Sequence, residues 1–396
     1  MAKVRVLAFI LTLLVVGLVG TYVSFYARGY RLNFVSLFTK GEIIFQPNGI
    51  LVIKSEPDGA SVFIDGELKT ATNATISIAP GTYDVEVRKD GYFTWYKRLV
   101  IEKEVVTQAG VSLFKNVPSL SPVTFSGAQN PVSSEDNGKI AFITPFTKDL
   151  PAEKIGLWVM DTFTLPLGFS NEPKRVTDGD LTGAVYQFSP DGRQILLTLS
   201  NSIFLLDSGS FVSQSQRVNV ASQKTTILAG WEKERKVRND SHIRNLPPDL
   251  TDILQRRTLS FNFSPDEQMI LYTASSSGTL PENLVRPLPG ASTQKQERNV
   301  LPDHTYVYDI KEDRNFLIAD QSNQVVRFMP NSRHLLLGQE GQVVVMDYDG
   351  TNRQTVYSGS YVAPYAFPYS NSTKLLILTN LGGTNSTPNL YTLTVK

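Results

Sequence analysis

Five copies of one local pattern, a tight turn followed by an apolar strand, recur through the last two thirds of the chain. They are SSEDNGKIAFIT (133–144), FSPDGRQILLTL (188–199), FSPDEQMILYTA (263–274), FMPNSRHLLLGQ (328–339) and YSNSTKLLILTN (369–380). A second apolar strand follows each copy, and four of these strands end in aspartate, namely Asp161, Asp207, Asp309 and Asp347. Repetition of one supersecondary unit is typical of arrays whose neighbouring units bury one another. The repeats therefore predict an all-β array of similar sheets.

A ring of sheets, the β-propeller, is the array that these repeats favour. Each blade is a twisted four-stranded sheet, and blades bury their faces by stacking around a central channel. Proline fixes φ in the repeated turn, and the neighbouring Asp or Asn side chain closes a local hydrogen bond. At about 40–50 residues per blade, the region would hold roughly six blades. We therefore expect five or six blades over residues 116–396, with a strand from Pro122 to Phe125 completing the last one.

One turn carries the pattern in full. Ser189-Pro190-Asp191-Gly192, together with third strands that end in Met-Asp, resembles the TolB-type, WD-repeat-like β-propeller family. The other four repeats depart from the full turn motif, which leaves the number of blades open. The resemblance implies a propeller fold for this part of the chain.

The longest interval between two repeated turns predicts an insertion at about 208–260. Its first part contains WEKERKVR (231–238), which mixes both charge signs and is interpreted as a solvated surface. Its second part begins with Pro247-Pro248, which suits the first turn of a helix. Three apolar residues follow at helical spacing: Leu250, Ile253 and Leu254. We expect a short helix here that caps one rim of the propeller.

An uncharged run of 21 residues, VLAFILTLLVVGLVGTYVSFY (6–26), lies near the start of the chain. As a helix it would be about 30 Å long, the thickness of the hydrocarbon core of a bilayer. A cleaved signal peptide is the alternative, but its apolar stretch is normally about 7–15 residues and ends in a small-x-small site. Here Phe25 stands two residues before Ala27. The run predicts a transmembrane anchor, with its flanks, over residues 1–31.

The membrane orientation is less strongly determined, because basic residues flank both ends of the run: Lys3, Arg5, Arg28 and Arg31. The positive-inside rule compares the charges of the two sides and does not decide here. A short N-terminal tail usually stays inside while the first apolar helix carries the remainder across. We therefore expect a single-pass protein in the cell membrane, with everything from about residue 32 on the extracytoplasmic side. Three tyrosines would then lie at the outer interface: Tyr22, Tyr26 and Tyr30.

The segment from Ile50 to Phe114 alternates apolar and polar residues with period two, which predicts half-buried strands. Turn dipeptides separate the strands, and we expect their glycines to supply the positive φ of tight turns: Asp58-Gly59, Asp65-Gly66, Pro80-Gly81 and Asp90-Gly91. Six or seven short strands in about 65 residues predict a small antiparallel β-sandwich. We place it at 49–115, after a linker at 32–48.

Three motifs in this segment resemble a PEGA domain. They occur in the order Pro57-Asp58-Gly59-Ala60, Ala79-Pro80-Gly81-Thr82-Tyr83 and Lys89-Asp90-Gly91-Tyr92, with Asp58 in the place of the glutamate that gives the family its name. The resemblance implies a compact β-sandwich of the kind found in bacterial and archaeal surface and envelope proteins. It brings no catalytic residue with it.

Composition limits the chemistry that the chain can carry. There are 38 Lys and Arg against 37 Asp and Glu, which gives a net charge of +1, and there is no Cys. Disulfides, thiolate nucleophiles and thiol-ligated metal centres are therefore excluded. The near-neutral charge argues against a nucleic-acid partner, which would require a strongly basic face. No Gly-rich phosphate loop, HExxH helix or GxSxG elbow occurs, so we expect no cofactor and no catalytic site.

The remaining candidate groups are better explained by structure than by chemistry. We interpret the three histidines, His242, His304 and His334, as structural. Two acidic pairs, Asp178 with Asp180 and Asp347 with Asp349, lack the spacing of a calcium loop and are expected to be turns. Four aromatic residues suit a sugar platform less well than strand packing: Tyr92, Phe93, Trp95 and Tyr96. Four glycosylation patterns are treated as chance matches, at Asn73, Asn239, Asn371 and Asn385.

A non-catalytic, membrane-anchored envelope protein is the function that these observations favour. It would present the two β units for binding or scaffolding, with an envelope protein or a cell-surface glycan as its partner. Two alternatives stay open: a propeller hydrolase or lyase with its site in the central funnel, and a structural component of a surface layer. The sequence does not distinguish the ligand, the rim used or the oligomeric state.

Overall fold

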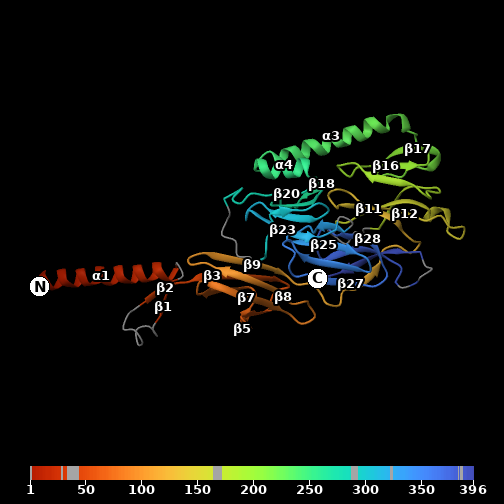
Figure 1. Cartoon of the computed structure of the whole chain (residues 1–396). Coiled ribbons are helices and arrows are strands. Elements are labelled where there is room, and N and C mark those ends of the chain that lie inside the picture. Colours follow the sequence, from red (N-terminus) through yellow and green to blue (C-terminus); the bar gives the residue numbers. More distant parts are fainter. Residues whose placement is uncertain are drawn as a thin grey trace. The chain divides into compact units, whose positions relative to one another are not determined.

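The computed structural model describes residues 2–27, 30–33, 44–163, 172–286, 293–321, 324–381, 383 and 387–396. The chain forms two compact units, Met1–Leu113 with Pro289–Gln294, and Phe114–Leu288 with Lys295–Lys396 (Figure 1). Within the described residues, strands dominate and the α-helices are α1, α3 and α4. The mostly β fold with an apolar N-terminal helix and a helical insertion is therefore confirmed.

Helix α1 spans Ala2–Ala27, and its side chains from Ala8 onward lie mostly exposed. That stretch holds no charged residue, and Thr12 and Thr21 donate hydrogen bonds to the carbonyls of Ala8 and Gly17. By length and composition the helix is able to cross a membrane, a test that a signal sequence also passes. A short antiparallel pair follows, β1 (Tyr30–Asn33) and β2 (Ile44–Pro47).

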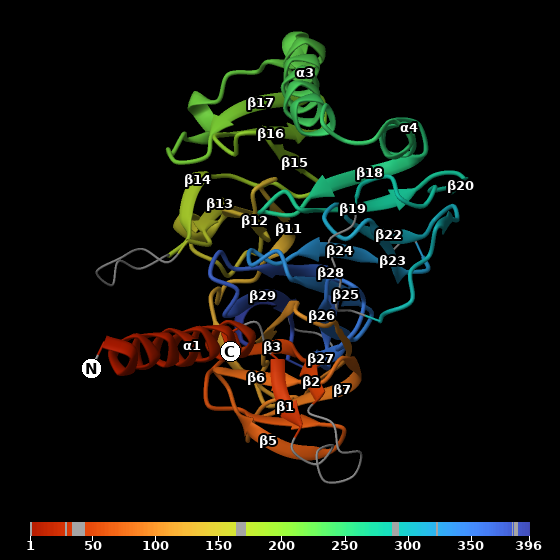
Figure 2. The same ribbon diagram turned by 90° about the vertical axis from the view of Figure 1, so that its left-hand side faces the viewer.

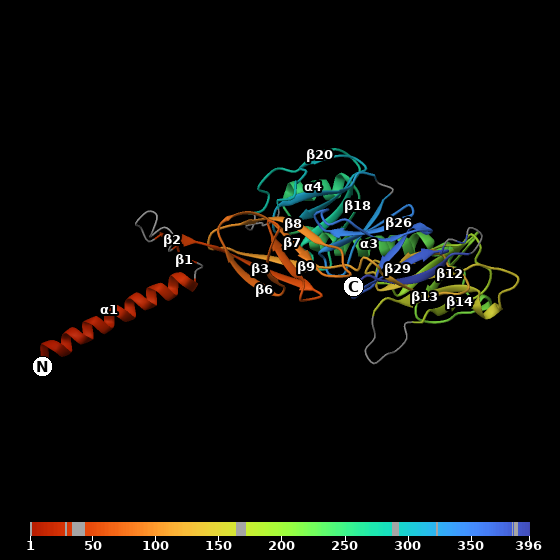
Figure 3. The ribbon, with the colours of Figure 1, turned by 90° about the horizontal axis from the view of Figure 1, so that it is seen from below.

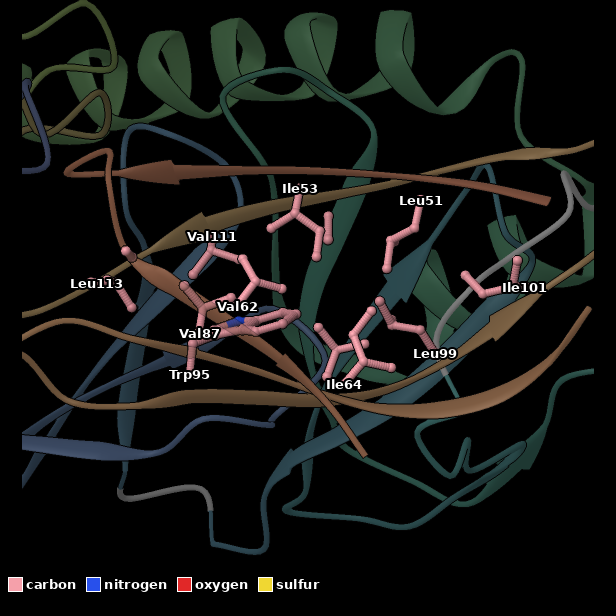
Figure 4. Packing of buried hydrophobic residues seen from close by; sticks show 13 residues of the cluster. Leu51, Ile53, Val62, Ile64, Val87, Trp95, Leu99, Ile101, Val111 and Leu113 are labelled. Atoms are coloured by element: carbon pink, nitrogen blue, oxygen red, sulfur yellow. The ribbon is translucent and has the colours of Figure 1, made fainter. Parts of the chain in front are cut away.

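Two sheets pack face to face in the first unit. One has the order β6 (Ala74–Ile78), β3 (Gly49–Glu56), β9 (Val106–Ser112). The other has the order β5 (Glu67–Ala71), β4 (Ser61–Ile64), β7 (Gly81–Arg88), β8 (Trp95–Ile101). Alternate residues of both sheets point inward, as Figure 4 shows for Leu51, Ile53, Val62, Val87 and Trp95. The apolar residues of the period-two pattern thus form the inward faces of the two sheets.

The sandwich is not purely antiparallel, which corrects the expectation from the sequence. Strands β3 and β9 run parallel, with Ile50 opposite Val106 and Glu56 opposite Ser112. The chain leaves β8 in one sheet, crosses to the other sheet and there lies beside the first strand of the unit in the same direction. Period-two alternation is the same in both strand directions, so the sequence pattern carried no information on this pairing.

Three of the four expected turn glycines have positive φ, and the fourth does not. Gly59, Gly66 and Gly91 have φ of 66°, 80° and 82°, whereas Gly81 begins β7 without a positive φ. Gly81 meets a different requirement. The ring of Tyr83 lies 3.3 Å from the place of a Cβ at Gly81, and the Tyr83 hydroxyl donates to the Ala79 carbonyl at 2.9 Å. The glycine therefore makes room for an aromatic ring.

The described part of the second unit contains five antiparallel sheets of three or four strands, which we number in chain order, and one two-stranded pair. Sheet 1 is β11 (Gln129–Ser133), β12 (Lys139–Thr144), β13 (Gly156–Asp161), β14 (Lys174–Thr177). Sheet 2 is β15 (Val185–Phe188), β16 (Gln194–Leu199), β17 (Ser202–Asp207). Sheet 3 is β18 (Thr258–Phe263), β19 (Met269–Ala274), β22 (Thr305–Asp309), β23 (Arg314–Ala319), with the small pair β20 (Gly278–Thr279) and β21 (Asn299–Val300) beside it in sequence.

Sheet 4 is β24 (Val325–Phe328), β25 (His334–Gln339), β26 (Gln342–Asp347), β27 (Gln354–Ser358). Sheet 5 is β28 (Tyr361–Pro368), β29 (Lys374–Thr379), β30 (Asn389–Thr394), β10 (Ser119–Pro122). Figure 3 shows members of sheets 3, 4, 5 and 1 following one another as β18, β26, β29 and β12. These sheets resemble propeller blades.

The five repeated turns share one backbone conformation. Each has a residue of positive φ at the same repeat position, namely Asn137, Gly192, Glu267, Ser332 and Ser372. In the first three turns a serine hydroxyl donates to the aspartate two residues later, over 2.5 Å at Ser134, 2.5 Å at Ser189 and 2.7 Å at Ser264. The turn therefore keeps its geometry even where glycine and proline are missing.

Each sheet buries at least one face against a neighbour or a helix. Shared apolar cores join sheet 1 to sheet 2, sheet 3 to sheet 4, and sheet 5 to sheet 1. The second face of sheet 2 packs against α3 (Lys224–Ile243) through Trp231, and the second face of sheet 3 packs against α4 (Pro248–Arg256). Figure 2 shows both helices on the side of the unit that holds sheets 2 and 3. The helices thus cover the two faces that a neighbouring blade would cover.

The last sheet takes its outer strand from the beginning of the unit. Strand β10 pairs with β30, with Leu120 opposite Leu393. The sequence placed this strand at 122–125, three residues too late. The shift has a simple origin: the amides of Val123 and Thr124 still donate to the Leu390 carbonyl, so the chain follows β30 beyond the last paired residue.

Candidate functional site

The first strands of the five sheets, β11, β15, β18, β24 and β28, form the candidate binding surface of the second unit. On β15, Tyr186 and Phe188 point into the core shared with sheet 1, while Val185 and Gln187 lie on the opposite, exposed side. Val185 is 70% exposed, and Leu259 at the start of β18 is 61% exposed. Large aliphatic side chains are thus left in contact with solvent on β15, whose other face is buried, and on β18, whose other side chains are at most partly buried.

Polar contacts tie neighbouring first strands together. The hydroxyl of Tyr186 on β15 donates to the backbone carbonyl of Asn130 on β11 at 2.5 Å. The hydroxyl of Tyr365 on β28 donates to the side-chain oxygen of Asn130 at 3.5 Å. Burial raises the pKa of Tyr186, so its hydroxyl stays a donor. Asn130, with a φ of 48°, is therefore the point where the first strands of sheets 5, 1 and 2 meet.

Arg327 is the one residue of these five described strands that carries a charge near neutral pH. It lies on β24, and its guanidinium carbon is 4.9 Å from the centre of the Phe367 ring on β28. The Nη1 atom is buried and has no hydrogen-bond partner among the described residues, and the buried hydroxyl of Tyr361 has none either. Burial lowers the pKa of Arg327, and Tyr361 is the one described group whose charge opposes that shift. This part of the surface holds a cation without a counter-charge.

The space around Tyr361 depends on a glycine. A Cβ at Gly338 on β25 would lie 2.5 Å from the Tyr361 hydroxyl oxygen and 3.2 Å from the Pro364 carbonyl oxygen. The register of β28 also shifts between Tyr361 and Ala366. Bulges of this kind re-aim side chains, and here the shift lies between Tyr361 and Phe367, the residue that contacts Arg327.

Helix α3 crosses the repeated turns of three sheets. Arg235 Nε is 2.5 Å from Glu135 Oε1 in the sheet 1 turn, and Arg238 contacts the other oxygen of Glu135 at 3.2 Å and the Pro190 carbonyl of the sheet 2 turn. His242 Nδ1 is 3.3 Å from Glu267 Oε2 in the sheet 3 turn. The segment expected to be a solvated surface is mostly exposed, and its arginines also bridge the turns of sheets 1 and 2.

The expected short helix is present and the long one was missed. In α4 the predicted stripe Leu250, Ile253, Leu254 is buried, and Pro248 occupies the first turn. In α3 the fully buried residues are Trp231 and Ile243, and charged side chains of both signs surround them. A signal was nevertheless available, because Ile227, Leu228 and Trp231 have the spacing of one helical face.

The three histidines lie apart from one another in structural positions. His334 Nδ1 accepts from the Asn331 side-chain amide at 2.8 Å, and its Nε2 faces Asp347 at 3.4 Å, so both nitrogens are engaged. His304 Nδ1 contacts the Pro302 carbonyl at 2.8 Å. His242 packs on Phe263 beside its ion pair. No nucleophilic serine contacts any of these rings among the described residues.

Asp180, Asp347 and Asp349 close turns, as expected, whereas Asp178 holds a segment 36 residues away. Asp178 accepts from the Gln214 amide at 2.5 Å, and Asp180 accepts from both the amide and the hydroxyl of Thr182. The Thr182 hydroxyl lowers the pKa of Asp180. Asp349 accepts from Thr351 in the same manner. Within the described ranges, no group of three or more potential metal ligands occurs.

A buried ion pair in sheet 3 was not visible in the sequence. Arg298 Nη2 is 3.2 Å from Asp313 Oδ2, with side chains 14% and 3% exposed. Asp313 also accepts from the Tyr308 hydroxyl at 2.5 Å and from the Leu284 amide at 3.2 Å. This network holds the segment between β19 and β22 against the β22–β23 turn. Its residues are far apart in sequence and carry no motif, so no local signal marks it.

The aromatic residues of the first unit do not form a platform. Trp95 is in the core, Tyr92 packs against that core, and Phe93 is half-buried, whereas Tyr96 is exposed. Strand packing therefore explains the group, as the sequence suggested. Of the glycosylation patterns, Asn73 and Asn371 are exposed, Asn239 is half-buried in α3, and Asn385 lies outside the described residues.

Comparison with known proteins identifies part of the chain. Residues 48–116 match the family model of the PEGA domain. No curated protein sequence matches the chain. A structure assigned as TolB from Agrobacterium tumefaciens is 13% identical, with 67% of this chain and 78% of that chain covered and a TM-score of 0.24. TolB from Acinetobacter baumannii is 12% identical, with 79% of this chain and 59% of that chain covered and a TM-score of 0.24.

A third structure, from carbohydrate-active enzymes family AA12 of Trichoderma reesei, is 10% identical, with 72% of this chain and 97% of that chain covered and a TM-score of 0.31. The chain spans about three fifths of the length of the Acinetobacter protein. The TM-scores are low, so the description of the second unit rests on its own sheets.

Proposed function

We propose, from the PEGA domain at residues 48–116 and the five blade-like sheets that follow it, that this chain is a non-catalytic binding protein held at a membrane by α1. The sheets act as a propeller in which α3 and α4 take the place of a sixth blade. Both β units lie on the extracytoplasmic side. The ligand is a segment of an envelope protein, bound by the first strands of the sheets.

The observation that carries this proposal is the exposure of Val185 on β15, whose other face is buried, and of Leu259 on β18, whose Phe261 and Phe263 are partly buried. Gln187 and Asn262, both exposed, lie on the same two strands. Aliphatic side chains next to amides complement a polypeptide, because the amides pair with backbone groups while the aliphatic groups exclude water. A glycan would more typically meet flat exposed aromatic rings.

In-cell cross-linking tests the proposal. A photo-reactive amino acid at Val185 or at Leu259 should capture the same envelope protein, and one at the exposed Lys233 of α3 should not. Combining Gln187→Ala with the Val185 probe should weaken that capture. Labelling of all three positions alike, or capture of glycan alone, would contradict the proposal.

The hydrolase alternative requires different side chains on the same strands. A hydrolytic site in the funnel needs acid and base groups converging from several first strands. The described side chains there are amides, hydroxyls, aliphatics and Arg327, which favour binding. Incubation of the full chain with cell-wall glycans and peptides, with and without divalent cations, separates the two functions: turnover would reject the binding proposal.

A further inference from the structure

Among the described residues, Arg327 is a half-buried cation whose buried Nη1 atom has no hydrogen-bond partner. Proteins rarely leave such a group unpaired, because an uncompensated buried charge is strongly destabilising. The contact with the Phe367 ring at 4.9 Å offsets part of this cost but supplies no acceptor. The second unpaired donor, the Tyr361 hydroxyl, belongs to the strand that packs against β24.

We propose that Arg327, with the Tyr361 hydroxyl, binds a carboxylate of an acidic residue in the protein ligand. The idea rests on the proposed function and names the chemistry of one contact within it. A planar guanidinium and one hydroxyl donor match the geometry and the single negative charge of a carboxylate. A phosphate near neutral pH carries about −1.5 to −2, and its second charge would stay uncompensated beside this single cation.

Two features around Arg327 and Tyr361 support a binding site. Gly338 leaves room for the Tyr361 hydroxyl, because a Cβ at position 338 would lie 2.5 Å from the hydroxyl oxygen. Part of the Arg327 side chain also remains accessible, because the residue is half-buried while its Nη1 atom is not exposed. A carboxylate would therefore first meet the accessible edge of the guanidinium, and Nη1 and the Tyr361 hydroxyl, which are both buried, would donate to it only after a side-chain movement.

A second buried arginine provides a matched control. Arg217 stacks on Phe204 at 5.0 Å, as Arg327 stacks on Phe367, but its Nη2 donates to the Asp178 carbonyl at 3.2 Å and the Asp178 carboxylate acts on it electrostatically. Arg217 thus has a counter-charge within the protein. The Nε and Nη1 atoms of Arg217 are also buried without a hydrogen-bond partner among the described residues, so the two arginines differ mainly in whether the protein itself supplies the anion.

The test measures thermal unfolding and calorimetric binding of the full chain in detergent. The probes are N-acetylglutamate α-amide, acetate, glucuronate and inorganic phosphate, each against sodium chloride at equal ionic strength.

N-acetylglutamate α-amide and acetate should raise the melting temperature of the wild type. Arg327→Met should melt at a higher temperature than the wild type without a probe and bind N-acetylglutamate α-amide at least about tenfold more weakly. Tyr361→Phe should weaken binding about threefold to tenfold. Arg217→Met should respond to the probe as the wild type does.

Several results would overturn the proposal. An unchanged response in Arg327→Met would place the binding elsewhere, and an equal effect of chloride would indicate an adventitious ion only. Tighter binding of phosphate than of the carboxylates would contradict the charge argument, and a response to glucuronate alone would indicate an acidic sugar. If the probes fail while cross-linking still captures an envelope protein, the carboxylate contact alone is rejected. If the probes bind while no protein is captured, the proposed function alone is rejected.

Discussion

At the scale of single residues, Arg298 and Arg327 of the second unit have opposite arrangements. Arg298 has a full set of partners around Asp313, whereas Arg327 stacks on an aromatic ring and its buried Nη1 atom has no partner among the described residues. A buried ion pair contributes little net stability, but breaking one is costly because it leaves a charge unpaired. The first arrangement therefore suits a structural role, and the second suits a site completed by a ligand.

The Arg298–Asp313 pair gives a direct stability prediction. Asp313→Asn should lower the free energy of unfolding by about 3–5 kcal/mol, because Arg298 stays buried without its counter-charge. Replacing both residues, as Arg298→Met with Asp313→Leu, should cost less than the single change. Denaturant unfolding of the full chain measures both, and equal costs for the two variants would contradict the assignment.

Buried tyrosines predict how stability depends on alkaline pH. Burial raises the pKa of Tyr369 to about 12. Burial also raises the pKa of six further tyrosines: Tyr186, Tyr272, Tyr306, Tyr308, Tyr348 and Tyr361. An unfolded tyrosine ionises near pH 10. The folded state is thus fully favoured below about pH 10, and stability is lost as pH rises toward the folded pKa values.

Tyrosinate absorbance and circular dichroism followed together through this range should show these residues ionising as the fold is lost. Tyr369→Phe should reduce the loss between about pH 10 and 12, because one group no longer titrates in the unfolded chain. Ionisation of the buried tyrosines near pH 10 with the dichroism unchanged would contradict the burial described above.

At the scale of elements, the turns were predictable because their chemistry is local. A serine, an aspartate two residues later and a positive-φ residue recur within a few positions, and the paired strands followed from them. Pairings that depend on distant chain segments were not predictable. The parallel pair β3–β9 and the Arg298–Asp313 contact leave no local trace, and α3 covers sheet 2 with few apolar residues.

Helix α3 should be held to sheet 2 mainly by one side chain. Trp231→Ala should cost about 3–5 kcal/mol, because it removes a large ring packed on Leu196 and Ile203. Lys233→Ala on the exposed side of the same helix is the matched control and should stay within about 0.5 kcal/mol. Glu135→Gln should cost at most about 1 kcal/mol, since its ion pairs are partly exposed. Equal effects of the Trp231 and Lys233 changes would show that α3 does not cover the sheet.

The pairing of β10 with β30 is testable by cross-linking, since the chain has no cysteine of its own. Ser121 lies directly opposite Thr392. The double variant Ser121→Cys with Thr392→Cys should form a disulfide that stabilises the oxidised chain by roughly 3–5 kcal/mol, because the bond closes a long loop. Ser121→Cys alone controls for the substitution. A pair that does not oxidise, or oxidises without raising the melting temperature, would place β10 elsewhere.

At the scale of the whole molecule, the sequence predicted an apolar helix, a PEGA domain and a set of blade-like sheets, and these are present. The partner was not predictable, because recognition depends on which side chains the first strands bring together. Val185, Leu259 and Arg327 come from three separate sheets, and nothing in their local sequence marks them as neighbours in function.

The central claim, a binding protein held at the membrane by α1 with both β units outside, is tested most directly by labelling single cysteines in intact cells. Ser276→Cys in the second unit and Ala2→Cys before the apolar run each provide one thiol in an otherwise cysteine-free chain. A membrane-impermeant maleimide should label Ser276→Cys in intact cells and Ala2→Cys only after lysis, with both variants in the membrane fraction. Protection of Ser276→Cys until lysis, or release of the protein in soluble form without its first residues, would contradict the account.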